Sequence, residues 1–194
     1  MTDDEEGIET FYSAERWQNW LDRVEEEDLD PENEDSARLL LNLQDDAAIA
    51  VAKILAAYEE GRVDEDRAVE ELGDVRDIVL SEVDFDDEDK LMLIDGVQTS
   101  LVPVFYAAEE YIVAGATEGE VDEFVRAAAG AEADEDLDAA LGYVVQAGTR
   151  VIDGDALDVD LLEEFEYGLV SEWVNGLDSL QSALEDPEVV EEEG

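Results

Sequence analysis

Apolar residues recur along most of this chain at intervals of three and four, the spacing of one face of an α-helix. The most apolar run is 91–114, with the sequence LMLIDGVQTSLVPVFYAAEEYIVA. On a helical wheel, more than half of its circumference is apolar, comprising Leu91, Leu93, Ile94, Val97, Leu101, Val102, Val104, Phe105, Ala108, Tyr111 and Ile112. The remaining sector carries Asp95, Gly96, Thr99, Tyr106, Glu109 and Glu110. A helix of this kind needs cover on several sides, so the run predicts the central helix of a bundle, over about 87–114.

Two features qualify the prediction for this central helix. Pro103 removes one backbone donor in mid-run, so we expect a kink there. A membrane span is the alternative interpretation of so apolar a run. Asp95, Gln98, Glu109 and Glu110 interrupt it, and charge exposed to lipid is costly. We therefore expect no membrane association.

Capping signals and periodic stripes predict the other helices. Ser13 precedes a first helix over 14–28, and Asp30 with Pro31 begins a second that ends at Gly61. Later helices are expected to begin with caps at Asp64 and Asp86, at Thr117 or Glu118, and from about Leu137. We also expect a loop over 130–136 and a turn at 153–155, which precedes a last helix over 159–184.

No alternating pattern typical of a β-strand reaches a useful length, and no internal repeat is evident. The sequence therefore predicts an all-α, single-domain bundle of about seven helices over 11–185. We expect disordered acidic tails over 1–10 and 186–194.

The charge balance is extreme. The 194 residues include 59 acidic and 10 basic side chains, a net charge of −49, yet 45% of the chain is hydrophobic. At molar salt the Debye length falls to about 3 Å, which screens most of the self-repulsion of such a chain. We infer a protein of a salt-in halophile, most simply a haloarchaeon. The alternative, a mimic of nucleic acid, needs carboxylates gathered on one surface, whereas these are spread along the whole length.

Composition also bounds the chemistry. The chain has no cysteine and no histidine, which removes disulfides, thiol chemistry and the commonest general base. The N-terminus has neither the positive charge nor the apolar core of a signal peptide, so we expect a cytoplasmic protein. No stretch gathers the Lys and Arg that direct binding to nucleic acid requires.

Paired carboxylates leave one enzymatic alternative open. All-α nucleotide pyrophosphohydrolases bind magnesium through such pairs, and Glu109, Glu110, Glu120 and Glu123 could form such a site. Only Arg126 lies nearby to hold phosphates, and so acidic a chain contains many such pairs by chance. A solvated acidic face is the simpler interpretation. We therefore assign no catalytic residue, metal site or cofactor.

The sharpest local feature is residues 11–24, FYSAERWQNWLDRV, with four aromatic residues and two arginines. Tryptophan and arginine are enriched at interface hot spots, so Arg16, Trp17 and Trp20 are candidate partner-binding residues. Tyr106 on the central helix is a weaker candidate. The alternative is that both tryptophans fasten the first helix to the bundle while the arginines offset neighbouring acids.

The opening FYSAERWQNWLDRVEEEDL, the length and the acidity resemble an uncharacterised archaeal family, a domain of unknown function found in haloarchaea and methanogens. The resemblance implies an archaeal cytoplasmic protein and supplies no catalytic residues. The function is unknown. We favour a non-enzymatic helical interaction or scaffold protein that binds a protein partner or a second copy of itself, with the magnesium-dependent nucleotide hydrolase as the alternative.

Overall fold

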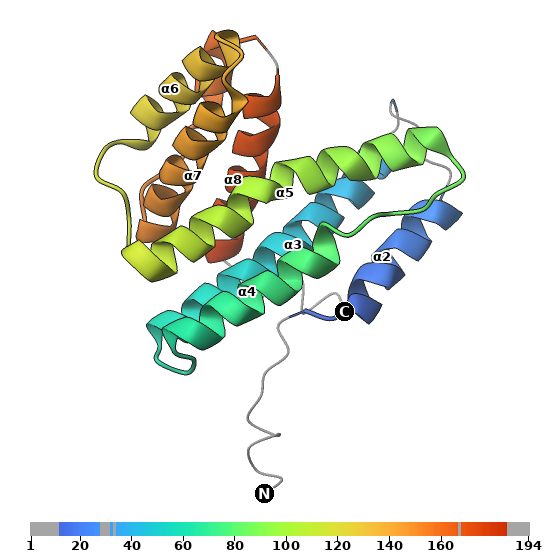
Figure 1. Cartoon of the computed structure of the whole chain (residues 1–194). Helices are drawn as coiled ribbons and strands as arrows, with labels where there is room; N and C mark the ends of the chain where they lie inside the picture. Colours follow the sequence, from blue (N-terminus) through green and yellow to red (C-terminus); the bar gives the residue numbers. More distant parts are fainter. Residues whose placement is uncertain (1–11, 28–31, 33, 167, 186–194) are drawn as a thin grey trace, which may run out of the picture.

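A computed structural model describes residues 12–27, 32, 34–166 and 168–185 of the chain. Within these residues it contains seven α-helices, one 3₁₀-helix and no strand (Figure 1). The elements are α2 (Ala14–Glu26), α3 (Glu34–Glu59), α4 (Glu65–Val79), α5 (Glu88–Ala114), α6 (Val121–Ala133), α7 (Leu137–Asp153), the 3₁₀-helix η1 (Val159–Glu164) and α8 (Leu169–Glu185). The predicted all-α bundle is confirmed. The predicted tails and the predicted cap at Asp30 and Pro31 lie outside the described residues.

Helix α5 is the centre of the bundle. It packs against α3, α4, α7 and α8, and Figure 1 shows it crossing from the group of α3 and α4 to the group of α6, α7 and α8. Most of its predicted core face is buried: Ile94, Val97, Leu101, Val104, Phe105, Ala108 and Ile112. The helix continues through Pro103, which is itself buried. Leu91 departs from the prediction and is exposed, because it lines an open hollow beside the segment that links α4 to α5.

Among the residues that the structure describes, α5 alone is long and apolar enough to cross a membrane. Half of its most apolar stretch is buried inside the bundle. Its apolar character is therefore accounted for by contacts with its four neighbouring helices.

Polar caps begin several helices where the sequence placed them. Ser13 Oγ accepts a hydrogen bond from Arg16 N at 3.1 Å, and Asp64 accepts one from Arg67 N at 2.8 Å. The cap of α5 was predicted one residue too early. Asp87, not Asp86, begins this helix, because its carboxylate accepts the free amide of Asp89 at 3.0 Å.

Helix α6 also differs from the prediction at both ends. It begins at Val121, because Gly119 has a φ of 137°, a conformation that no helix residue adopts. It then continues to Ala133, through much of the predicted loop over 130–136.

The predicted last helix over 159–184 is in fact two elements. Residues 159–164 form the 3₁₀-helix, and α8 begins only at Leu169. The break is explained by a tertiary contact: the Glu132 carboxylate of α6 accepts the amides of Leu169 at 2.7 Å and Val170 at 3.3 Å. A carboxylate there satisfies free donors and complements the helix dipole, so it favours a new helix start.

Helices α5 and α8 cross very closely. A Cβ atom placed on Gly176 would lie 1.7 Å from the backbone oxygen of Ser100. Beside this crossing, Ser100 Oγ lies 2.8 Å from Gln44 Oε1, and Gln44 Nε2 donates to Ser179 Oγ at 2.7 Å. This buried network joins α3, α5 and α8, and so fixes how these three helices lie against one another.

Candidate functional site

The aromatic and arginine residues of α2 surround a buried carboxylate on α3. Asp46 is 2% exposed and accepts Arg16 Nε at 2.7 Å and Trp20 Nε1 at 2.8 Å, with a second Arg16 nitrogen on its other oxygen. A bidentate arginine is the strongest neutralising partner for a carboxylate removed from water. Burial, and then the Asp46 charge, raise the pKa of the adjacent Tyr12 phenol.

This arrangement shows what three of the four candidate residues contact. Trp17 is 3% exposed and lies in the hydrophobic core, whereas Trp20 is half-buried and Arg16 reaches from the surface to Asp46. All three side chains therefore hold α2 against the bundle, the fastening role considered as the alternative. A role toward a partner stays a prediction for them.

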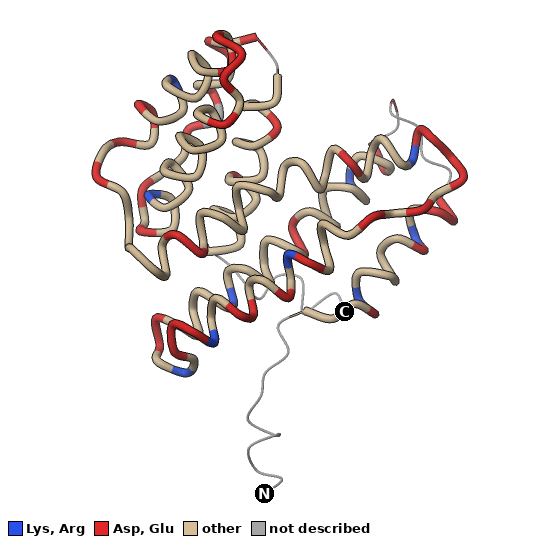
Figure 2. Tube along the Cα trace, viewed as in Figure 1, with Lys and Arg blue, Asp and Glu red and all other residues tan. Residues whose placement is uncertain are grey.

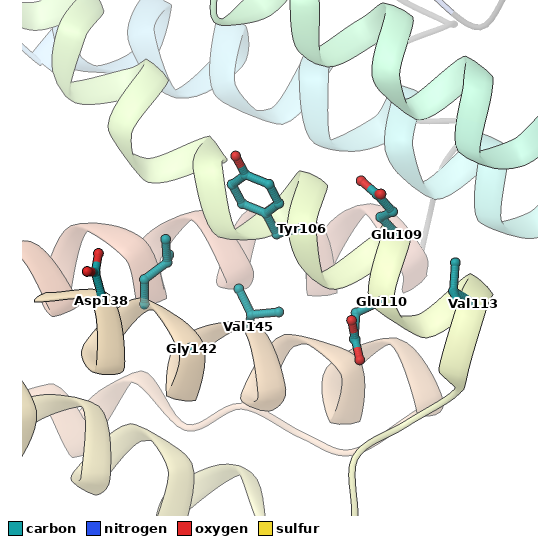
Figure 3. Close-up of a pocket in the computed structure, with 8 residues that line it drawn as sticks. Tyr106, Glu109, Glu110, Val113, Asp138, Gly142 and Val145 are labelled. Atoms are coloured by element: carbon teal, nitrogen blue, oxygen red, sulfur yellow. The ribbon is translucent and has the colours of Figure 1, made fainter.

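Tyr106 lies in a different environment. It is 43% exposed and lines a hollow of about 450 Å³ between α5 and α7, to which none of the other three candidates contributes. The lining residues are Tyr106, Glu109, Glu110, Val113, Asp138, Leu141, Gly142 and Val145. Figure 3 shows α5 and α7 on either side of this hollow, with Val145 directed from α7 toward α5.

The hollow has an apolar floor. Leu141 and Val145 are half-buried, and Val113, at 58% exposed, continues the apolar surface along α5. Gly142 has no atom within 4 Å of a Cβ placed on it, so the absence of a side chain there leaves space open to solvent. An exposed tyrosine beside such a floor is typical of a surface that binds another molecule.

The rim of the hollow is acidic. Glu109, Glu110 and Asp138 line it, and no Lys or Arg is among the lining residues that the structure describes. Glu109 Oε2 lies 3.5 Å from Arg76 Nη1 of α4, and this partly exposed ion pair contributes little to stability. The hollow therefore combines apolar contact area with net negative charge.

The sequence indicated only part of this hollow. Tyr106, Glu109 and Glu110 belong to the polar sector of the central helix. Val113, Gly142 and Val145 were missed, because their role depends on how α7 lies against α5. The exposed glycine within a helical stretch was the one available signal.

A family model described as an uncharacterized protein conserved in archaea (DUF2150) matches residues 10–193. The chain belongs to this archaeal family. The resemblance seen in the N-terminal stretch is thus confirmed, while the occurrence of the family in haloarchaea and methanogens stays a prediction. No curated protein and no solved structure matches the chain.

Membership of the archaeal family brings no assigned chemistry, so the hydrolase alternative rests on geometry alone. Glu109 and Glu110 lie on α5. Glu120 occupies the N-cap position of α6 without a capping hydrogen bond from its side chain, and Glu123 lies in the first turn of α6. Among the residues that the structure describes, no group of three or more acidic side chains is placed to hold a metal ion. The convergence of four carboxylates that the hydrolase alternative predicts is not found in that part of the chain.

Acidic residues are distributed over the whole described chain. Figure 2 shows them on every helix group and on the connecting segments, with the few basic residues interspersed. This distribution matches the even spread seen in the sequence and differs from the single charged face that a nucleic-acid mimic needs.

Proposed function

We propose that this chain is a non-enzymatic, cytoplasmic interaction protein of an archaeal cell, which binds an apolar segment of a protein partner in the hollow between α5 and α7. The observation that carries the proposal is the exposed pair Tyr106 and Val113 beside the open floor at Gly142. On a chain with a net charge of −49, each exposed apolar side chain departs from an otherwise strongly hydrated surface.

The shape of the hollow favours a protein segment over a small molecule. Small-molecule sites are concave and bury most of their ligand, whereas this hollow lies open along two helices with Tyr106 and Val113 standing at its edge. Aromatic residues at such positions contribute large contact areas to protein interfaces. A side chain such as leucine, entering between Leu141 and Val145, would cover both.

The acidic rim defines the chemistry of the partner. Glu110 and Asp138 favour Lys or Arg beside the apolar side chain that enters the hollow. We propose further that the protein works in a salt-rich cytoplasm, where its own repulsion is screened. The apolar contact then supplies most of the affinity, and the carboxylates select the partner.

The test is a quantitative pull-down at about 2 M KCl, a concentration at which surface charge is largely screened. Wild type, Tyr106→Gln, Val113→Gln and the control Leu41→Gln are compared by mass spectrometry. Leu41 is an exposed leucine of α3 outside the hollow. A partner retained by wild type and by Leu41→Gln, and lost with both hollow variants, supports the proposal. Equal recovery with all four proteins refutes it.

A further inference from the structure

A second hollow lies on α5, near its N-terminal end. It measures about 510 Å³ and lies between the first turns of α5 and the segment that links α4 to α5. Its lining residues are Leu80, Ser81, Glu82, Val83, Glu88, Leu91, Met92, Asp95 and Gln98. Gln98 Nε2 donates to the carbonyl oxygens of Val79 at 2.9 Å and Ser81 at 2.8 Å. These hydrogen bonds fix the linking segment in place as one wall of the hollow.

The second hollow repeats the chemistry of the first. Met92 is 72% exposed and Leu91 lies beside it, with Leu80 and Val83 forming an apolar side. Three carboxylates surround them, those of Glu82, Glu88 and Asp95. No Lys or Arg is among the described residues that line this hollow. Each hollow thus offers exposed apolar contact area within an acidic rim.

The two hollows lie on the same face of α5. Tyr106 follows Glu88 by 18 residues, as Val113 follows Asp95, and 18 residues make about five complete helical turns. The hollows are therefore aligned along the helix at a separation of about 27 Å. Between them, Thr99 and Val102 are half-buried, so part of this face stays accessible from one hollow to the other.

The face allows close approach beside the second hollow, at Gly96. Gly96 has no atom within 4 Å of a Cβ placed on it, which leaves its backbone accessible from outside. Small side chains at a helix surface let a second helix lie close to the first. The stretch from Met92 to Val113 is therefore one continuous surface, which we call the outer face of α5.

Resting on the proposed function, we infer that the outer face of α5 binds a single amphipathic helix of at least five turns, with apolar side chains near both ends and Lys or Arg flanking them. An extended segment would leave its backbone groups unpaired, because the described residues present no strand edge to pair with it. A helix satisfies its own backbone. A second copy of this chain would instead bring a matching set of carboxylates against those of both hollows.

The probe is a labelled synthetic helix of about 22 residues, long enough to span both hollows, with a leucine stripe flanked by lysine. Its binding is measured by fluorescence anisotropy at about 2 M KCl. Two control peptides accompany it: a half-length version and a version with glutamate in place of lysine. The protein variants are Met92→Gln, Val113→Gln and Leu41→Gln, which leave the net charge unchanged.

The long lysine peptide should bind more tightly than the half-length peptide, and its smaller advantage over the glutamate peptide should increase as the KCl concentration is lowered. Met92→Gln and Val113→Gln should each weaken its binding about fivefold to tenfold, the loss expected for one buried apolar side chain, and Leu41→Gln should leave it unchanged. Photo-crosslinkers at the two ends of the peptide should label opposite ends of α5.

The remaining outcomes separate this inference from the proposed function. If only Val113→Gln weakens binding, or the half-length peptide binds equally well, the continuous surface is refuted while the α5–α7 hollow stands. If neither variant differs from Leu41→Gln, or no peptide binds, the basic helix is refuted, and the pull-down with Tyr106→Gln and Val113→Gln decides the proposed function. If sedimentation shows a dimer that Met92→Gln and Val113→Gln dissociate, the occupant is a second copy, and the basic helix is refuted.

Discussion

Substitution of Gly176 tests how closely α8 crosses α5. A Cβ atom there would lie 1.7 Å from Ser100 O, whereas real Cβ contacts essentially never fall below 3.0 Å. The helices must therefore separate locally by at least about 1.3 Å, the difference between these distances, in Gly176→Ala. Because the contacting atom is backbone, no side-chain rotation can relieve the clash.

The magnitude combines three effects. Overpacking of this kind costs about 1 to 3 kcal/mol. Separation also lengthens the 2.8 Å contact of Ser100 with buried Gln44, and a buried polar group left without a partner costs about 1 to 3 kcal/mol more. Alanine returns about 1 kcal/mol through its higher helix propensity. We expect a net loss of about 1 to 5 kcal/mol in the free energy of unfolding.

The assay is urea unfolding at constant KCl, followed by far-ultraviolet circular dichroism, with Gly142→Ala as the matched control. Gly142 also lies within a helix, but open space surrounds it, so alanine should stabilise the protein by about 0.5 to 1 kcal/mol. The two variants should thus shift the transition in opposite directions. If Gly176→Ala is as stable as wild type, the close crossing and its buried network are wrong.

Three further predictions concern charged side chains. Arg16→Met should destabilise the protein by about 2 kcal/mol in urea unfolding, because it leaves the buried Asp46 charge poorly paired. The control Arg126→Met removes an exposed pair with Glu164 and should change stability by less than about 0.5 kcal/mol. Burial raises the pKa of Asp45, so the stability contribution of its carboxyl group is present at low pH and is lost as the pH rises through that pKa. Asp45→Asn should therefore be more stable than wild type at neutral pH. In thermal unfolding, this difference should vanish as the pH falls to ~4. Glu132→Ala should cost about 1 kcal/mol and increase amide hydrogen exchange in the first turn of α8, and unchanged exchange there would contradict the capping role.

The sequence predicted the helices and most of the buried face of α5, because apolar periodicity and caps are local signals. Helix ends were missed where a tertiary contact decides them, as Glu132 does for the start of α8. The buried position of Asp46 also could not be predicted from the sequence. In a chain so rich in acids, nothing in its neighbours distinguishes the one carboxylate that Arg16 and Trp20 neutralise from those that face solvent.

The outer face of α5 could be predicted from the sequence only in part. Helix α5 packs against four helices, so only a narrow sector of its circumference is left uncovered. That sector was identified from the sequence by its polar members, such as Asp95, Thr99 and Tyr106. Met92 and Val113 share it and are the more informative residues, since solvation of an acidic surface gives no reason for either. Carboxylates alone would be explained by adaptation of the surface to salt. On α5, however, carboxylates surround exposed apolar side chains at two places on one face. A partner that supplies both apolar contacts and positive charge explains this arrangement better.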